Sequence, residues 1–487
     1  MAAELTGRRP AFPLVILATG VPMFMATLDN LVMTNALPVI HVDLGATVEE
    51  LQWFINAYTL AFAGVILLAV ALGDRVGRRN VFIAGIALFT LASVAAALST
   101  DPTQLILART VQGVGGAGIM PLSLSLLAGA VDERRRPLAI GIWGGVAGLG
   151  VAAGPLVGGA VVEGWDWHAI FWLNVPVGLI AIPLALLVLP AGTRSRLPID
   201  VVGMLLAALG VLGIVYGIVR GNDAGWGSAE VIGALVLGAG LLATFIGWER
   251  RNPAPLLPLR LFRDRSFAIA NVVGLGFSFG IFGAVFILIQ YLQVVQGASP
   301  LQAAVQTMPW TTAPMVVAPL AGLVAPRVGT RLLIVTGLML QAGALGWLGL
   351  TIATDTAYGE MLPAFLAAGI GMSLVFAPSS TAVLANITEA DTAKASGTNS
   401  TMREIGTALG IAVLTAVFTG AGGELTPTGY VAAAQPAVLV GAVALTLTAA
   451  AALLLPAGRS HIRRAAEPPL TATPHDLESE AIPALTP

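Results

Sequence analysis

The sequence contains no cysteine, and its four histidines stand far apart, at positions 41, 168, 461 and 475. Without cysteine the chain can form no disulfide, no thiolate nucleophile and no cysteine-ligated metal site. No Gly-Lys-Ser/Thr phosphate loop occurs, so direct use of ATP is not supported. No nucleophile stands beside a base. We therefore expect no metal, no cofactor and no enzymatic activity.

Charge is also scarce, because only 10% of the 487 residues are charged while 56% are apolar. Soluble proteins carry roughly a quarter charged residues. The arginine clusters are not interleaved with aromatic residues, so nothing indicates nucleic-acid binding. This composition indicates a protein that lies in a lipid bilayer. The excess of Ala, Gly and Arg is typical of a GC-rich bacterial genome.

Hydropathy divides the chain into about fourteen apolar stretches, each near the roughly 20 residues that cross a bilayer. The predicted fold class is therefore an all-α membrane protein. The first stretch is too long for a cleaved signal peptide and is expected to be a retained span. The predicted spans are 14–37, 52–72, 81–98, 103–128, 138–161, 169–190, 201–220, 230–248, 267–290, 301–325, 331–353, 360–385, 401–420 and 435–456.

Basic residues mark one side of the membrane. Nearly all of the 24 Lys and Arg residues fall on the termini or on connections after even-numbered spans. Only Arg220 lies on the opposite connections, and only Arg109 lies well inside a span. Because Lys and Arg are retained on the cytoplasmic side, we predict a bacterial inner-membrane protein with both termini in the cytoplasm. The segment 459–487 is expected to be a disordered tail.

A short motif occurs twice, as Gly73-Asp-Arg-Val-Gly-Arg-Arg79 after the second span and Ala325-Pro-Arg-Val-Gly-Thr-Arg331 after the tenth. If spans 1–6 and 9–14 are equivalent halves, spans 7 and 8 are an insertion. Repeated six-helix halves around a central site are a transporter architecture. We therefore predict four regions: an N-terminal bundle (1–195), two inserted transmembrane helices with a cytoplasmic linker (196–260), a C-terminal bundle (261–458) and the tail.

Asp29 and Arg109 are ionisable residues inside predicted spans of the N-terminal half, where such groups indicate function. Both are predicted at about 9–12 Å below the outer boundary, from a rise of 1.5 Å per residue. Burial favours a neutral carboxyl and a nearby guanidinium favours a charged one, which suits a group that loads and releases a proton. A purely structural ion pair is the alternative. Gln112, one turn after Arg109, is either a hydrogen-bonding companion or a packing residue.

The charged loop after the second span contains Asp74, Arg75, Gly77, Arg78 and Arg79. These residues could serve only to fix the orientation of the chain. Alternatively, Asp74 could accept hydrogen bonds from Arg or cap a helix of the other half, and so latch the cytoplasmic side shut.

The fifth span carries Gly150, Gly154, Pro155, Gly158 and Gly159. Glycines four residues apart let a neighbouring helix approach closely, and a proline kinks a helix. The stretch is therefore a candidate hinge or seal, with tight packing alone as the alternative.

Several polar and aromatic residues inside the spans are candidates for a substrate cavity. For Trp310 the alternative is anchoring at the membrane interface, and for the phenylalanines it is a lipid-facing or core stripe. The candidates are Asn35, Asn56, Tyr58, Trp143, Phe282, Phe286, Gln290 and Trp310.

Together these motifs resemble the major facilitator superfamily along nearly the whole chain, and within it the fourteen-helix drug:proton antiporters. The matching stretches are Leu28–Pro38 in the first span, Asp74–Arg79 in the following loop, Arg109–Gly113 in the fourth span, Gly150–Gly159 in the fifth, and Trp165–Pro176 before the sixth. The sequence departs from the family pattern at Val70, where a glycine is usual, and at His168, where an arginine is usual.

The resemblance implies a major facilitator fold of two six-helix bundles plus two inserted helices, around a cavity that opens alternately to each side. It implies proton-driven export of small amphipathic compounds by a monomer, with proton coupling at Asp29. Relatives with acids inside C-terminal spans bind dicationic drugs. No acid is predicted well inside a span there, so we expect monocationic, neutral or zwitterionic substrates.

Three alternatives remain. The first is a dedicated exporter of one metabolite, antibiotic or lipid. The second is a receptor or scaffold with an inactive transporter fold, against which the buried charges argue. The third, a membrane enzyme, is weaker because no catalytic pair is visible.

Overall fold

The computed structural model describes residues 11–132, 134–191, 200–253, 255–388 and 391–456. This part of the chain is helical almost throughout and contains no strand. Twelve of its helices are long and apolar enough to cross a membrane. Two further long helices, α5 and α11, have 29 residues each. The all-α membrane class is confirmed, whereas the total of fourteen spans stays a prediction, as do the region boundaries. Those at 195–196 and 458–459, with the tail, lie outside the described residues.

The N-terminal half consists of six long helices and one short one. Polar caps start two of them: Thr47 forms a capping box with Glu50, and the Asp101 side chain accepts a hydrogen bond from the Gln104 backbone. Such side chains satisfy backbone N–H groups that have no partner within the helix. The helices are α1 (Phe12–Leu44), α2 (Val48–Val76), α3 (Arg78–Ala97), α4 (Pro102–Ala130), α5 (Arg136–Gly164), α6 (Ala169–Trp172) and α7 (Asn174–Val188).

A helical hairpin, α8 (Val201–Ala224) and α9 (Ala229–Glu249), separates this half from the next, and a short 3-10 helix, η1 (Leu259–Arg263), follows it. The C-terminal half then contains α10 (Arg265–Val294), α11 (Pro300–Val328), α12 (Thr330–Thr351), α13 (Tyr358–Leu384), α14 (Thr392–Gly420) and α15 (Pro427–Ala452).

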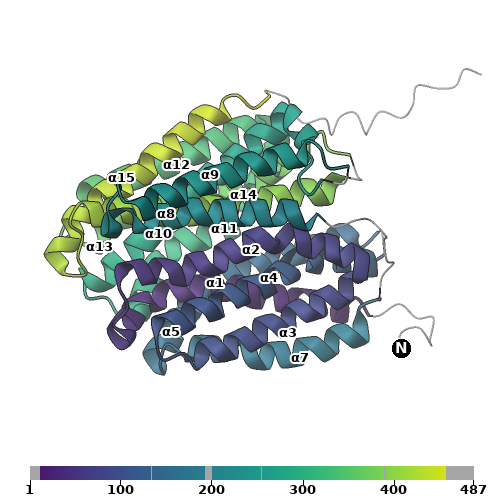
Figure 1. The fold of residues 1–487 in the computed structure, drawn as a ribbon, viewed down its shortest axis with the longest axis horizontal. Helices are drawn as coiled ribbons and strands as arrows, with labels where there is room; N and C mark the ends of the chain where they lie inside the picture. Colours follow the sequence, from purple (N-terminus) through teal and green to yellow (C-terminus); the bar gives the residue numbers. More distant parts are fainter. Residues whose placement is uncertain (1–10, 133, 192–199, 254, 389–390, 457–487) are drawn as a thin grey trace, which may run out of the picture.

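The two halves lie side by side along two seams (Figure 1). Helix α5 packs on α11 at one seam, and α2 packs on α14 at the other. The hairpin lies over the second seam, where α8 contacts both α2 and α14. The inserted helices are therefore in contact with both halves.

The ends of the bundle differ in charge. We call one the acidic end, formed by the connections 45–47, 98–101, 165–168, 225–228, 295–299, 352–357 and 421–426. We call the other the arginine end, formed by Gly77, 131–132, 134–135, 189–191, Asp200, 250–253, 255–264, Gly329, 385–388 and Asp391. In Figure 1 the arginine end is the one on the side of the marked N-terminus.

Two glycines show that the repeated motif has the same structure in both halves. Gly77 alone joins α2 to α3 with φ 113°, and Gly329 alone joins α11 to α12 with φ 91°. A side chain is strongly disfavoured at such positive φ values. The repeat therefore preserves a one-residue corner between helices.

Replacing Gly329 by alanine should destabilise the protein, because the backbone conformation there costs a residue with a Cβ about 1–3 kcal/mol. A Cβ at Gly329 would meet no atom within 4 Å, so the effect isolates the backbone. The measurement is the thermal unfolding midpoint of the purified protein.

The matched control is Gly343→Ala in α12, where a Cβ also meets nothing within 4 Å and the backbone is helical. Alanine favours a helix over glycine by up to about 1 kcal/mol, so this variant should be at least as stable as the wild type. Equal midpoints for the two variants would contradict the assigned corner.

Candidate functional site

Asp29 is the centre of a buried hydrogen-bond network in the N-terminal half. Its Oδ2 lies 2.5 Å from Nη1 of Arg109 on α4. Its Oδ1 accepts hydrogen bonds from Gln112 Nε2 at 2.8 Å and from Asn174 Nδ2 at 2.7 Å. Asp29 is 4% exposed and Arg109 is fully buried. Three helices, α1, α4 and α7, therefore converge on one carboxylate.

The Arg109 guanidinium is held by several further contacts. Its Nε donates to the backbone oxygen of Phe54 at 3.1 Å, and Nη1 also donates to Gln112 Oε1 at 2.6 Å. Its carbon lies 4.5 Å from the ring centre of Tyr58, a distance typical of a cation–π contact. Arginine stays charged in proteins, so these contacts fix a permanent positive charge beside Asp29.

Sequence reasoning missed two members of this network. The Ser93 hydroxyl on α3 accepts hydrogen bonds from Gln112 at 2.9 Å and from Asn174 at 3.2 Å. Asn174 lies near the start of the sixth predicted span, and an amide inside a span is the only signal that could have indicated it. Ser93 gave no signal, because a serine that donates to the backbone four residues earlier is ordinary in a membrane helix.

The partners of Asp29 include one group that can bond to a carboxylate or to a protonated carboxyl. A carboxylate only accepts hydrogen bonds, whereas a protonated carboxyl must also donate one. The Gln112 side-chain amide can supply either role, because its oxygen and its nitrogen are both within the network. Protonation of Asp29 would remove the negative partner of Arg109, and the network would have to rearrange.

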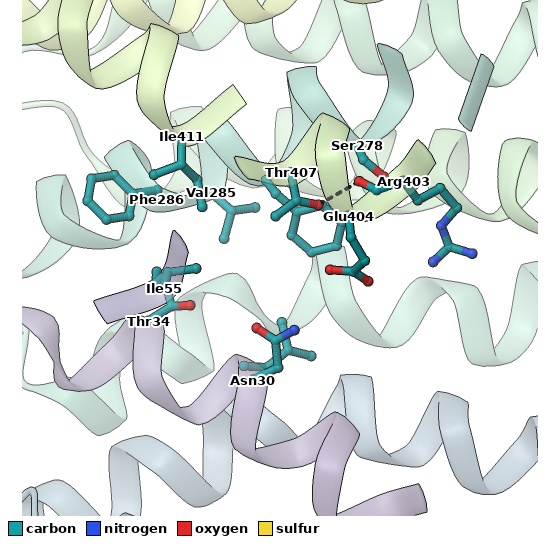
Figure 2. Close-up of a pocket in the computed structure, with 12 residues that line it drawn as sticks. Asn30, Thr34, Ile55, Ser278, Val285, Phe286, Arg403, Glu404, Thr407 and Ile411 are labelled. Carbon is teal, nitrogen blue, oxygen red and sulfur yellow. Dashed lines mark hydrogen bonds between the residues drawn. The ribbon is translucent and has the colours of Figure 1, made fainter. Parts of the chain in front are cut away.

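A small cavity lies between the two halves, lined in part by Asn30, the residue after Asp29 (Figure 2). It measures about 60 Å³, far below the roughly 300–1,000 Å³ of a typical drug site. The halves must therefore separate before a drug-sized molecule fits. Helices α1, α2, α10 and α14 supply the lining: Asn30, Leu31, Thr34, Ile55, Ser278, Phe282, Val285, Phe286, Arg403, Glu404, Thr407 and Ile411.

Glu404 corrects the expectation that no acid lies well inside a C-terminal span. Helix α14 begins at Thr392, nine residues before the predicted start at 401, so Glu404 lies twelve residues inside it. The polar first turns of α14 lower the local hydropathy, which explains the misplaced start. In Figure 2 the Glu404 side chain extends toward Asn30 of α1. Among the described residues its carboxylate forms no hydrogen bond or ion pair.

Arg403 likewise corrects the expectation that only Arg109 lies well inside a span. Its guanidinium carbon lies 4.1 Å from the ring centre of Phe376 on α13, and its Nε is buried without a partner in the described structure. The arginine is thus directed toward α13, and Glu404 lines the cavity without an ion pair.

The predicted cavity residues divide into two groups. Phe282 and Phe286 line the central cavity. Phe282 also lines a second cavity, together with Trp310 and Pro155. These three aromatic side chains therefore face inward between the halves.

The other five predicted cavity residues lie elsewhere. Tyr58 lies under Arg109, and Asn56 is fully buried with its amide unpartnered among the described residues. The remaining three are Asn35, which donates to Pro155 O, Trp143, which donates to Ser123 Oγ, and Gln290, which donates to Phe286 O. Gln290 also lines an open cavity of about 740 Å³ between α1 and α10 at the acidic end, so it is a cavity residue, although not of the central cavity.

The glycine face of α5 packs on two different helices. A Cβ on Gly150 would lie 3.1 Å from Thr27, one on Gly154 2.7 Å from Leu31, and one on Gly158 3.0 Å from Val32, all on α1. A Cβ on Gly159 would lie 2.6 Å from the backbone oxygen of Pro300 on α11. The face therefore serves packing within one half and, at Gly159, close approach between the halves. A role as hinge or seal stays a proposal.

Direct hydrogen bonds between the halves gather at the acidic end. Gln293 Nε2 donates to the backbone oxygen of Asn35 at 3.0 Å. Glu163 Oε2 accepts from Ser299 Oγ at 2.6 Å and from the Leu301 amide at 3.3 Å. The direct hydrogen bonds that the structure shows between the described parts of 12–188 and 265–452 therefore lie at the acidic end.

The predicted latch loop lies at the other end and bonds only within its own half. Arg78 Nε lies 2.8 Å from Asp74 Oδ1, and Arg79 Nη1 donates to Leu189 O at 3.0 Å. Arg75 is exposed, and the Gly77 amide closes the end of α2. In the described chain no hydrogen bond ties this loop to the C-terminal half, so a latch there stays a prediction for another conformation.

Comparison with known proteins gives concordant matches. The family model of the Major Facilitator Superfamily matches residues 21–411. The Tetracenomycin C resistance and export protein of Streptomyces glaucescens is 33% identical over 425 residues, covering 87% of this chain and 79% of that protein. Multidrug resistance protein Stp of Mycobacterium tuberculosis is 34% identical over 406 residues, covering 83% of this chain and 75% of that protein.

The fold also matches solved structures. A crystal structure of an autoinhibited POT family peptide transporter superposes with a TM-score of 0.68 at 16% identity, covering 91% of this chain and 96% of that one. At this identity the match concerns the fold alone.

Replacing Arg109 by methionine should destabilise the protein by about 3–5 kcal/mol, because it leaves the Asp29 carboxylate buried without its charged partner. The double variant Asp29→Asn, Arg109→Met carries no unpaired charge and should recover part of that loss. Thermal unfolding of the purified variants measures both effects. If the double variant is no more stable than Arg109→Met, the two residues do not act as a pair.

Proposed function

This chain belongs to the major facilitator superfamily, and we propose that it is a proton-coupled antiporter that exports drugs or antibiotics by alternating access. As a member of this superfamily it is a transporter and not an enzyme. Relatives named for drug resistance and antibiotic export support the substrate class. The observation that carries proton coupling is the buried Asp29 carboxylate, bonded to Arg109, Gln112 and Asn174.

We further place the chain in the fourteen-helix drug:proton group, acting as a monomer in the bacterial inner membrane. The arginine end then faces the cytoplasm, because basic residues are retained there. In that orientation the closed acidic end faces outward. Substrate would enter the central cavity from the cytoplasm.

Helix α1 links the proton site to the cavity. Asp29 points into the network of the N-terminal half, while the next residue, Asn30, lines the central cavity with Leu31. Successive helical residues point about 100° apart, from 3.6 residues per turn. A proton that loosens the hold of Arg109 on Asp29 thereby frees the helix that forms the cavity wall.

The driving force is adequate for export. One charge crossing a potential of about 100 mV releases about 2.3 kcal/mol. This supports roughly a 50-fold accumulation, since about 1.4 kcal/mol corresponds to a factor of ten. One proton at Asp29 per cycle is therefore enough for a useful gradient of an uncharged substrate. Exchange of one proton for one monocation moves no net charge, so that exchange is driven by the pH difference across the membrane.

The cavity chemistry suits amphipathic compounds that carry a positive charge. Phe282 and Phe286 provide aromatic surface, and Glu404 provides an acid without an ion pair among the described residues. Aromatic rings and carboxylates both attract cations where water is excluded. Among the expected substrates, Glu404 therefore favours the cationic ones, which it would hold in the C-terminal half.

A second candidate function is export of one particular antibiotic or metabolite. One relative is named for a single compound and another for multidrug resistance, so the family accommodates both. A gene position inside a biosynthetic cluster would favour the dedicated exporter. A wild-type protein that is well expressed yet exports no general dye would favour it too.

Asp29→Asn should leave the protein folded and abolish uphill export, because an amide cannot carry the coupling proton. The measurement is ethidium efflux from energised cells, with and without a protonophore. Wild-type efflux should be sensitive to the protonophore, and the variant should show none above background.

The control is Asp355→Asn, which makes the same acid-to-amide change at an exposed connection. It should transport like the wild type. Normal drug resistance in Asp29→Asn at full expression would rule out Asp29 as the coupling site.

Glu404→Gln should weaken export of monocationic ethidium by roughly tenfold, the scale of one charge interaction of about 1.4 kcal/mol. Export of an uncharged compound such as chloramphenicol should change less. Thr407→Val, which alters a neutral residue of the same cavity wall, should not discriminate between the two. Equal losses for both compounds in Glu404→Gln would show that the carboxylate does not select charge.

A further inference from the structure

The last turns of α8 hold one helix from each half at the acidic end. Arg220 Nη1 lies 3.1 Å from Glu49 Oε2 on α2. Two residues later, Asn222 Nδ2 donates to the backbone oxygen of Ala416 and to Thr419 Oγ1, at 2.7 Å, on α14. Arg220 and Glu49 are about three-quarters buried, with 25% and 27% of their side chains exposed. One helix end therefore bridges the α2–α14 seam.

Arg220 and Asn222 also form bonds within the hairpin. Arg220 also pairs with Asp223 at 2.6 Å and with Glu230 on α9 at 3.0 Å. The Trp226 indole donates to Asn222 Oδ1 at 2.8 Å, which orients the amide toward α14. Arginine can serve several carboxylates because it has five N–H donors.

The seam beneath the bridge carries polar atoms without partners. On α2, Gln52 Oε1, both amide atoms of Asn56 and Thr59 Oγ1 are buried and unpaired in the described structure, as is Thr415 Oγ1 on α14. These four residues are at most 3% exposed. Buried polar atoms normally have a protein or water partner.

Helix periodicity places two of the α2 members, Asn56 and Thr59, on the side of α2 that faces α14 and α8. Leu60, Ala63 and Leu67 of α2 line a cavity whose other walls come from α14, at Thr398, Met402 and Ile405, and from the hairpin, at Met204, Ala208 and Val211. Asn56 lies one turn before Leu60, and Thr59 one turn before Ala63, on the same side of the helix. We call Gln52, Asn56, Thr59 and Thr415 the polar seam.

Water would satisfy these atoms if the seam opened, so the polar seam opposes its own closure. We propose that the inserted hairpin is a clasp, in which Arg220 and Asn222 hold α2 against α14 and so set the balance between closed and open acidic ends. This proposal rests on the alternating-access function proposed above. It also accounts for Arg220, the basic residue that stands apart at the acidic end.

Distance measurements between spin labels test the clasp directly. The native chain has no cysteine, so Val42→Cys and Ala421→Cys, both exposed at the acidic end in different halves, need no other change. In purified, unenergised protein, Arg220→Ala with Asn222→Ala should raise the ratio of long to short distances by roughly tenfold. Asn56→Leu, which removes a polar seam amide, should lower it.

The matched control is Glu230→Gln, which weakens a bond inside the hairpin and leaves both bridges in place. It should keep the wild-type distance distribution. An unchanged distribution in the Arg220, Asn222 double variant would overturn the clasp. The distance measurement needs no proton gradient, so its outcome does not depend on whether Asp29 is the coupling site.

A cross-linking experiment tests the clasp if the Arg220, Asn222 double variant does not fold. Glu49→Cys and Arg220→Cys, joined by a short bis-methanethiosulfonate reagent, fix the α2 side of the clasp covalently. Transport in a cysteine-bridged protein should stop and should return when dithiothreitol releases the reagent. Full transport with a complete cross-link would overturn the proposal.

Discussion

The N-terminal half depends on one buried ion pair. Asp29 and Arg109 lie almost fully buried, and the carboxylate left without the guanidinium would be strongly destabilising. Arg109 without the carboxylate would keep its bonds to Phe54 O and Gln112 Oε1 and its contact with the Tyr58 ring. Amides from two helices and the Phe54 carbonyl complete the hydrogen bonding of the pair. Because these bonds cross helices α1, α2, α4 and α7, those helices cannot shift independently. Conformational change is therefore directed to the seams between the halves.

The two seams differ in chemistry. At the α5–α11 seam, Gly159 lets backbones meet closely, and Glu163 bonds to the start of α11. At the α2–α14 seam, polar side chains are buried without a hydrogen-bond partner among the described residues. The glycine surface of the α5–α11 seam allows the two halves to slide past each other. The polar surface of the α2–α14 seam is stabilised by contact with water. The inserted hairpin covers only the second seam, where closure is opposed.

The sequence predicted the parts of this protein that depend on position along the membrane normal. Charge alternation and hydropathy indicated the helices, and matching depth placed Asp29 near Arg109. Depth does not specify which way a side chain points around its helix, so the contributions of Ser93 and Asn174 required coordinates. Glu404 was missed because hydropathy averages over a window, and the polar start of α14 shifted the predicted span past the true helix start.

Asp29 and Asn30 are neighbours on α1, and this determines how a proton and a substrate can exclude each other. The proton site and the cavity wall share no atom, yet both are built on the same turn of α1. A rigid helix has one orientation at a time. Under the proposed cycle, proton and substrate would compete for the rotation of α1 and not for a common pocket. Such a protein can accept chemically varied substrates, because the competition between proton and substrate does not depend on the chemical structure of the substrate.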